Sequence, residues 1–460
     1  MAIVKKSERL GKEKIGKLLI KLSIPAIVGM VIQSLYNIID TIYVGKLSTD
    51  ALSALSLAFP IQMVIISLGV GTGVGASSLI SRLLGAGNKK RAENAAEHVF
   101  FIAIIFGIAT AIVGAFFAED ILRLFTDSEK LIGLTMQYIP VIMIGSIAVY
   151  VPATFNYILR GEGNTFVPML TMIIGAVTNI ILDPFLIFGL WFFPKMGIAG
   201  AAYATISARL LGGIFITKVL LSDKNELTLR LRYFKPDFKI LKEIYEVGIP
   251  AMANRLLFSV ALALINKILG TFNTTAIGVM GVIFRLQSLF LMAIFGLNQG
   301  YLPIVGYNYG HKNPERMKKT IKLGGLTALS FGTFGFLLFF VFPETMLGIF
   351  NKNPEFLRIG VHAFKRVSFS YMFLSLNIIG VATFQAMGRG LPSFALTVLR
   401  QMILLVPGLY ILGNTFGLNN AWLAFPIAES VTFTITATWL YHCIKKEVKY
   451  LYDSKGLETT

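Results

Sequence analysis

Long apolar stretches recur along the whole chain of 460 residues, and they limit the folds that it can adopt. A helix that crosses a bilayer needs roughly 20 consecutive, mainly apolar residues. By length, about twelve stretches of this sequence qualify. They cover residues 22–44, 52–79, 95–117, 131–159, 167–190, 198–221, 244–269, 276–301, 321–342, 360–386, 393–412 and 421–443. The chain is therefore expected to be an all-α integral membrane protein.

The charged residues agree with a membrane setting. Charged residues make up 14% of the chain, against about 25% in an average soluble protein. The net charge of +18 would suit a nucleic-acid partner, but Lys and Arg gather in alternate gaps between the apolar stretches. That pattern is typical of cytoplasmic loops. We therefore expect contact with a lipid bilayer and no nucleic-acid partner.

The same basic gaps predict the orientation of the chain. Lys89–Arg91 and the stretch 312–322 are basic, as are the segments next to both termini, whereas the intervening gaps are short or mixed. Because cytoplasmic loops carry the excess of Lys and Arg, both termini are expected on the cytoplasmic side of the plasma (inner) membrane, with multiple passes between them.

The chain also repeats itself. The segment LSIPA, which contains Pro25, resembles VGIPA, which contains Pro250, and the same offset of 225 residues links Gly75 to Gly300. Each half holds an even number of the expected spans, so both halves begin on the same side of the membrane. We therefore predict two six-helix lobes related by a pseudo-two-fold axis along the membrane normal, as in some secondary transporters. The predicted N-lobe is 1–222, the cytoplasmic linker 223–242 and the C-lobe 243–460.

The first span carries a carboxylic acid, Asp40, among apolar residues. Tyr36, Asn37 and Asp40 are three or four residues apart and so share a helix face, as do Asn179 and Asp183 in the fifth span. A charged Asp at the bilayer centre costs about 2.5–3.5 kcal/mol on insertion scales, and such residues are functional by default. We expect both acids to face a polar cavity and to bind a cation there.

Further polar residues extend this candidate site. Thr205 offers a hydroxyl in the sixth span, and Gln33 and Asn156 are further candidates for the cavity beside Tyr36 and Asn37. The alternative interpretation is that these polar residues only form hydrogen bonds between helices. Pro25 lies in the same span as Asp40 and is a candidate hinge, because proline allows a helix to kink.

The second half does not repeat the acids. The residue equivalent to Asp40 is Ile265, so we place the cation site in the first half alone. Glu429 in the last span is expected to form a structural ion pair with Arg400 or Arg285, since buried charges are usually paired. The roles of Arg285, Arg255 and Lys267 remain open.

Four segments resemble multidrug and toxic compound extrusion (MATE) transporters, and most of all their prokaryotic DinF-like branch. The segments are LYNIIDTIYVG (35–45), ILRGEGN (158–164), NIILDPFLIFG (179–189) and GIAGAAYAT (197–205). In that family the matching positions form a cation site in the N-lobe. The resemblance implies that Asp40, Asn179, Asp183 and Thr205 hold a proton or Na⁺.

The resemblance implies a secondary active multidrug efflux antiporter rather than an enzyme. It would export organic, often cationic compounds in exchange for H⁺ or Na⁺, without a cofactor and as a monomer. The alternative is a flippase for lipid-linked oligosaccharides or other lipids, which should line its cavity with basic residues. The spans of the first half hold few of these. The substrate, the coupling ion and the stoichiometry are not predicted.

The orientation can be tested by chemical labelling. Single cysteines at Lys89, Lys224 or Lys312, in a Cys443→Ser background, should react with a membrane-impermeant thiol reagent only from the cytoplasm, because these positions lie in basic gaps. Cysteines at Lys46 or Lys195 should react from outside. Reversed labelling would contradict the predicted orientation.

Overall fold

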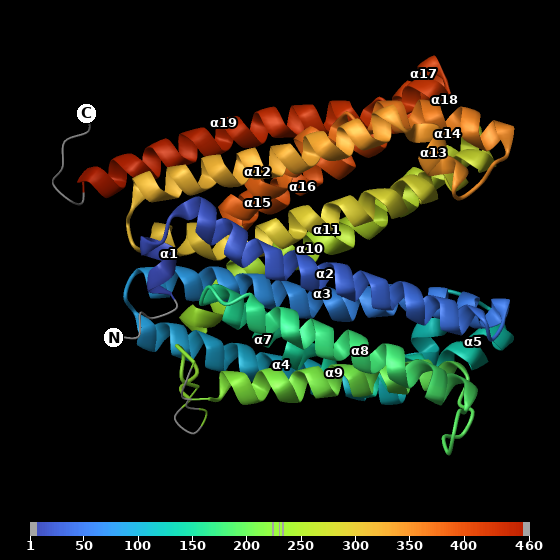
Figure 1. The fold of residues 1–460 in the computed structure, drawn as a ribbon, viewed down its shortest axis with the longest axis horizontal. Coiled ribbons are helices and arrows are strands. Elements are labelled where there is room, and N and C mark those ends of the chain that lie inside the picture. The colour runs from blue at the N-terminus through green and yellow to red at the C-terminus, as the bar shows by residue number, and fades with distance from the viewer. Residues whose placement is uncertain (1–6, 223–224, 230, 232–233, 454–460) are drawn as a thin grey trace.

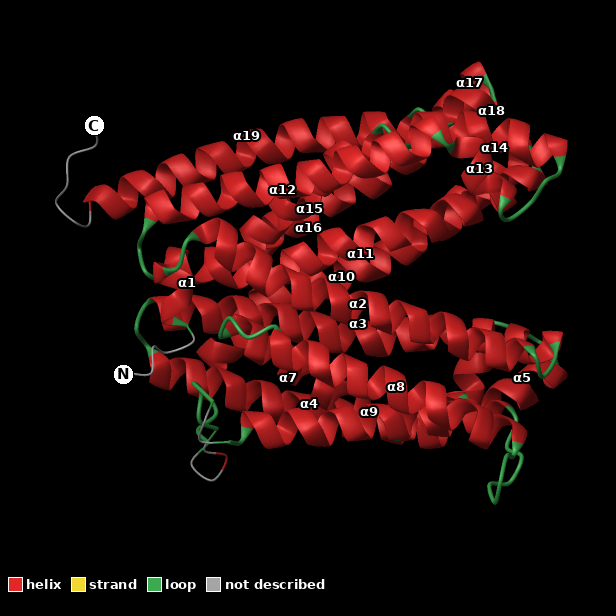
Figure 2. Cartoon of the chain, viewed as in Figure 1, coloured by secondary structure: helices red, strands yellow, loops and turns green. Residues whose placement is uncertain are grey.

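The chain is nearly all helix (Figure 2). The computed structural model of the protein describes residues 7–222, 225–229, 231 and 234–453, and no strand occurs in these ranges. Ten of its helical segments are long and apolar enough to cross a membrane, or up to twelve if each of two bent pairs counts as one span. The predicted all-α membrane fold is therefore confirmed.

The unbent spans begin and end close to the predicted stretches. They are α2 (Ile15–Gly45), α3 (Thr49–Gly85), α4 (Lys89–Arg123), α8 (Phe166–Phe188), α9 (Ile198–Leu220), α10 (Phe238–Phe272), α11 (Thr274–Gly310), α12 (Pro314–Val341), Gly390–Phe416 and Leu418–Glu447. The segment Gly390–Phe416 contains α16 (Gly390–Val398), a π-helical turn (Leu399–Leu405) and α17 (Val406–Phe416). The last segment contains α18 (Leu418–Ala421) and most of α19 (Ala424–Asp453). Two short helices lie outside the spans, α1 (Glu8–Lys12) and α13 (Pro343–Gly348).

Two predicted spans are bent. The stretch expected at 131–159 consists of α5 (Glu129–Met136) and α6 (Ile139–Ile144), followed at 50° by α7 (Ile147–Gly161). The stretch expected at 360–386 consists of α14 (Pro354–Val367) and α15 (Ser370–Ala386), at 47° to each other.

The side chains at the breaks account for the bends. Gly145 and Ser146 occupy the first break, and Ser368 lies in the second. The hydroxyl of Ser146 donates to the carbonyl of Gly107 at 2.9 Å, and that of Ser368 donates to Lys365 at 3.2 Å. Glycine and serine at one point of a helix are a known cause of sharp kinks.

The helices form two groups, α2 to α9 and α10 to α19 (Figure 1). The groups lie together at the end that carries both chain ends, and they diverge toward the opposite end. The boundaries predicted for the lobes stay predictions, and residues 223–224, 230 and 232–233 of the predicted linker lie outside the described residues. Helix α10 already begins at Phe238, before the predicted boundary at residue 243.

Reciprocal backbone contacts join the two groups where they lie together. A side-chain carbon added to Gly85 of α3 would meet the carbonyl of Tyr307 on α11, and one added to Gly310 of α11 would meet the carbonyl of Arg82 on α3. Gly85 and Gly310 are 225 residues apart, and so are Arg82 and Tyr307. Such exchanged contacts are what a two-fold axis between two similar surfaces produces.

The same reciprocity continues along the helices. Gly71 of α3 lies against Met252 of α10, and the equivalent Gly296 of α11 lies against Ile27 of α2. Small residues let membrane helices approach closely and gain dispersion contacts. The pairs α3 with α10 and α2 with α11 therefore hold the two groups together around one pseudo-two-fold axis, as the internal repeat predicts.

Cross-linking tests whether this contact must open. Cysteines at Arg82 and His311, in a Cys443→Ser background, lie near each other at this end, since the backbone of Arg82 contacts Gly310, the neighbour of His311. Oxidation should abolish transport and leave binding from the diverging end intact, while each single-cysteine variant treated with oxidant should transport normally. Full transport by a sample with a verified cross-link would exclude rocking at this end.

Candidate functional site

The four residues predicted to bind a cation come together from three helices. The side chains of Asp40 on α2 and Asp183 on α8 lie within hydrogen-bonding range of each other. Asn179, also on α8, donates from Nδ2 to Asp183 Oδ1 at 3.3 Å and to the hydroxyl of Thr205 on α9 at 3.4 Å. Asp183, Asn179 and Thr205 are buried and Asp40 is half-buried.

Three oxygens of this cluster have no hydrogen-bond partner among the described residues. They are Asp40 Oδ1, Asp183 Oδ2 and Asn179 Oδ1, and all are buried. In the described part of the chain, no Lys or Arg forms an ion pair with either acid. Two carboxylates repel each other at this range unless a proton or a cation lies between them. Oxygen donors suit hard cations, so the cluster fits either a proton or Na⁺.

A cavity of about 400 Å³ lies beside the cluster and touches both groups of helices. Six of the predicted residues line it: Gln33, Tyr36, Asn37, Asn156, Asn179 and Thr205. α2, α7, α8 and α9 supply these side chains, and Met292 and Gln299 of α11 lie on the other side.

The acids themselves do not line this cavity, contrary to our expectation from the sequence. Asp40 is one helical turn beyond Tyr36, and Asp183 is one turn beyond Asn179. Residues four apart share a helix face, but they differ in depth along the axis by about 6 Å. The two acids therefore lie behind Asn179 and Thr205, which belong both to the cluster and to the cavity wall.

Three arginines line the cavity and were not among the predicted cavity residues. They are Arg160, Arg209 and Arg255, and the first two come from the half in which we expected few basic residues. Arg160 is only 2% exposed, and its guanidinium carbon lies 4.8 Å from the centre of the Tyr157 ring. Arg209 lies close enough to Asp40 for its charge to act on that acid.

A further side chain near Asp40, that of Tyr138, was also missed. Tyr138, which precedes α6, is buried and accepts a hydrogen bond from Gln62 Nε2 at 3.1 Å. It lies close enough to Asp40 for the two groups to interact electrostatically.

Pro25, the predicted hinge, lies inside α2, which runs unbroken through it. Its role as a hinge stays a prediction.

The predicted ion pair of the second half is present. Glu429 Oε1 lies 3.0 Å from Arg400 Nη1, and Glu429 Oε2 accepts from Asn377 Nδ2 at 2.8 Å. The partner is thus Arg400 and not Arg285. Arg285 and Lys267 are both exposed.

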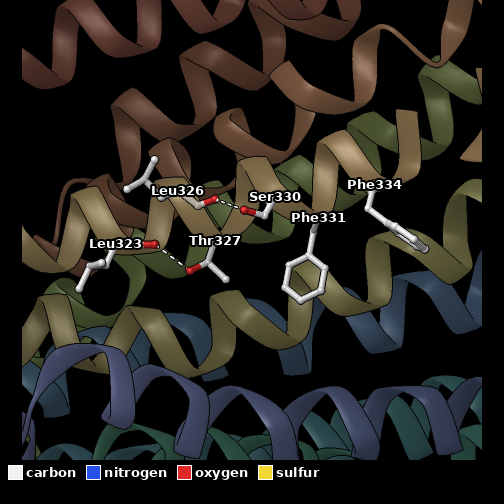
Figure 3. A pocket seen from close by; sticks show the side chains of 6 residues that line it. All are labelled: Leu323, Leu326, Thr327, Ser330, Phe331 and Phe334. Atoms are coloured by element: carbon white, nitrogen blue, oxygen red, sulfur yellow. Dashed lines mark hydrogen bonds between the residues drawn. The ribbon is translucent and has the colours of Figure 1, made fainter. Parts of the chain in front are cut away.

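A second hollow, of about 570 Å³, runs along one face of α12 (Figure 3). Its two hydroxyls are already used within the helix, since Thr327 donates to Leu323 at 2.9 Å and Ser330 to Leu326 at 3.0 Å. The other lining side chains are apolar. This surface on a membrane-spanning helix suits lipid tails and offers no polar group for a specific ligand.

Comparison with known proteins adds independent evidence. The profile of the MatE family matches residues 25–185 and 250–411, and the two matches begin 225 residues apart. The chain is 30% identical to a probable multidrug resistance protein NorM of Thermotoga maritima over 89% of each chain. It is 27% identical to an FAD transporter of Shewanella oneidensis over 90% of this chain and 92% of the other.

A solved structure resembles the whole molecule. It is described as an outward-facing conformation of a multidrug resistance MATE family transporter of the MOP superfamily. The TM-score is 0.91 at 28% identity, and the match covers 98% of this chain and 100% of the other. The assignment to the DinF-like branch in particular stays a prediction.

Thermal unfolding tests the cation cluster. A cation that binds only the folded protein stabilises it by about 2.7 kcal/mol at a hundred times its Kd. Raising Na⁺ or lowering the pH should therefore raise the Tm of the parent. Asp183→Asn should abolish that rise. Asp50→Asn, which removes an exposed acid paired with Lys130 at 2.5 Å, should keep it. An undiminished rise in Asp183→Asn would place the cation elsewhere.

Proposed function

Because the chain belongs to the MATE family of membrane transporters, we propose that it is a secondary active antiporter that exports organic compounds in exchange for H⁺ or Na⁺. The observation that carries this proposal is the pair Asp40 and Asp183, whose carboxyl groups lie close together, with no ion pair to a described basic residue, one turn from the cavity. The acids hold the coupling cation, and the cavity holds the substrate.

Helix α2 couples the two sites. Tyr36 and Asn37 form part of the cavity wall, and Asp40 follows them one turn later on the same helix. Loading a cation changes the contact between Asp40 and Asp183, and a kink at Pro25 lets α2 respond as a unit. The cavity wall then moves, so the cation and the substrate favour different conformations. Opposed conformational preferences are what exchange requires.

The driving force is large enough for useful export. One positive charge moving inward through 100 mV releases about 2.3 kcal/mol. That free energy supports a concentration ratio of roughly fifty-fold for a neutral substrate, since 1.4 kcal/mol corresponds to a factor of ten. One cation for each substrate is therefore sufficient.

The arrangement of the two helix groups supports alternating access. With both termini in the cytoplasm, the diverging end faces the outside (Figure 1), in line with the outward-facing conformation of the similar solved structure. The lobes rock so that their contact at Gly85 and Gly310 opens during the cycle, and the cavity then opens to each side in turn. All of the site residues come from one chain, and the transporter acts as a monomer in the inner membrane.

A flippase for lipid-linked anions is the second candidate function. It is favoured by Arg160, Arg209 and Arg255, because guanidinium groups bind phosphates. We retain antiport as the main proposal because only the exchange of a cation gives the cluster around Asp40 and Asp183 a role. The relatives also carry different names, a multidrug resistance protein and an FAD transporter, which indicate different cargos.

Transport measurements test the exchange. Proteoliposomes should move a fluorescent substrate when a pH jump or a sodium jump is applied, and the jump that works identifies the ion. Asp40→Asn keeps the size of the side chain but cannot release a proton or offer a charge, so driven transport should fall at least tenfold at equal protein abundance. It should fold as well as the parent, because it removes a buried charge. Driven transport equal to the parent's would rule out the coupling role of Asp40.

A further inference from the structure

The cavity has a charge of its own. Its lining includes Arg160, Arg209 and Arg255, and no Asp or Glu is among the lining residues. We propose that the exported substrate is an aromatic organic anion that carries a phosphate or carboxylate group, and not an organic cation. The inference rests on the proposed export function and gives it a substrate class.

Arg160 is the strongest single indication of an anionic ligand. It is 2% exposed, lines the cavity, and has a buried Nε with no hydrogen-bond partner in the described chain. Its guanidinium group lies against Tyr157, within hydrogen-bonding range, and forms no ion pair with a described acid. A buried charge is costly unless it is paired, and the planar guanidinium binds carboxylates and phosphates through two parallel hydrogen bonds. A substrate anion supplies the missing partner.

The other two arginines face the cavity from opposite groups of helices. Arg209 is on α9 of the first group, and Arg255 is on α10 of the second. Neither has an ion-pair partner in the described residues. An anion between them is attracted by both groups at once. Rocking of the lobes changes the distance between the two arginines and so changes the affinity for an anion during the cycle.

A basic residue also lies on the approach to the cavity. Gln299 and Met292 of α11 line it, and they are seven residues apart, about two helical turns. Arg285 is seven residues before Met292, so it continues the same face about 10 Å nearer to the diverging end. An anion entering or leaving at that end passes a further positive charge.

The apolar part of the lining indicates the body of the substrate. Tyr36, Tyr150 and Tyr157 supply aromatic surface, and Met30, Met63 and Met172 supply flexible apolar surface. Tyrosine rings stack on aromatic ligands, and methionine adapts to ligands of different shape. The cavity therefore suits flat aromatic bodies of varied outline that share an anionic group.

The membrane potential assists this cargo. In a cell that is negative inside, 100 mV favours outward movement of each negative charge by roughly fifty-fold and opposes outward movement of a cation by the same factor. Exchange of an inward cation for an outward anion thus uses the potential twice.

Two dyes that share a xanthene ring system and differ in charge test the proposal. Binding of carboxyfluorescein, an anion, and rhodamine 123, a cation, is measured on the full chain in lipid nanodiscs. The parent should bind carboxyfluorescein at least tenfold more tightly. Arg209→Gln and Arg255→Gln should each weaken that binding about tenfold, since hydrogen bonds to charged groups contribute about that much. Arg123→Gln is the matched control, because Arg123 pairs with exposed Glu119 and Glu129 at the end of α4.

The outcomes separate the possible sources of the anion. Gradient-driven movement of carboxyfluorescein that undecaprenyl pyrophosphate does not inhibit supports a soluble anion. Displacement of bound carboxyfluorescein by that lipid, with the same loss in the arginine variants, overturns the aromatic substrate in favour of a lipid headgroup. Tighter binding of rhodamine 123, or unchanged carboxyfluorescein binding in both arginine variants, overturns the proposal.

Two results distinguish a wrong substrate class from a wrong exchange function. If an ion jump drives rhodamine 123 and not carboxyfluorescein, the exchange function stands and the anionic substrate is wrong. If carboxyfluorescein binds through the arginines but no ion gradient moves it, the substrate class stands and the exchange function is wrong.

Discussion

The approach of two carboxyl groups inside the first group of helices is the constraint on which the site depends. Asp40 and Asp183 come from different spans, and neither has a basic ion-pair partner in the described chain. Side by side and away from water, two acids are held together only by a proton or a cation. Asp183 Oδ2 and Asn179 Oδ1 accept no hydrogen bond from a described residue, so the neighbouring side chains do not satisfy these oxygens. The cluster is therefore a place where the binding of a small cation changes the structure.

The contact between the two helix groups lets that change move one group relative to the other. Gly85 and Gly310 allow backbone to meet backbone at one end, and the repeat provides each contact twice. This symmetric contact closes one end of the molecule and has to open during the cycle, and residues of both groups line the cavity. Arg209 and Arg255 sit on opposite sides of the cavity. The affinity of the cavity for its substrate thus depends on the angle between the groups.

The sequence predicted the parts of the molecule that follow from spacing and length. The spans were found by length alone, the pseudo-two-fold axis by the offset between Pro25 and Pro250, and the faces of α2 and α8 by residues three or four apart. The meeting of Asp40 with Asp183 follows from packing between helices, which spacing within one helix does not determine. Helical spacing gives a face but not a depth, so the position of the acids behind the cavity wall was not predicted.

Other features were missed for identifiable reasons. Ser146 and Ser368 lie at the bends, and the average hydropathy of a span does not register single serines. Arg209 lies in the sixth predicted span, so its sequence position alone identifies it as an intramembrane charge, as for Asp40. Arg160 directly follows a predicted span, and a basic residue at such a position is typical of a loop at the membrane surface.

The central claim is that the cluster around Asp40 and Asp183 exchanges a cation against a substrate in the adjoining cavity. The most direct measurement counts the cations that the purified protein releases when substrate is added, with a pH indicator in weak buffer for H⁺ and a sodium electrode for Na⁺. The account predicts about one cation released for each substrate bound by the parent, and none by a double Asp40→Asn, Asp183→Asn variant that still binds substrate. Saturating substrate binding by the parent without release of either ion would contradict it.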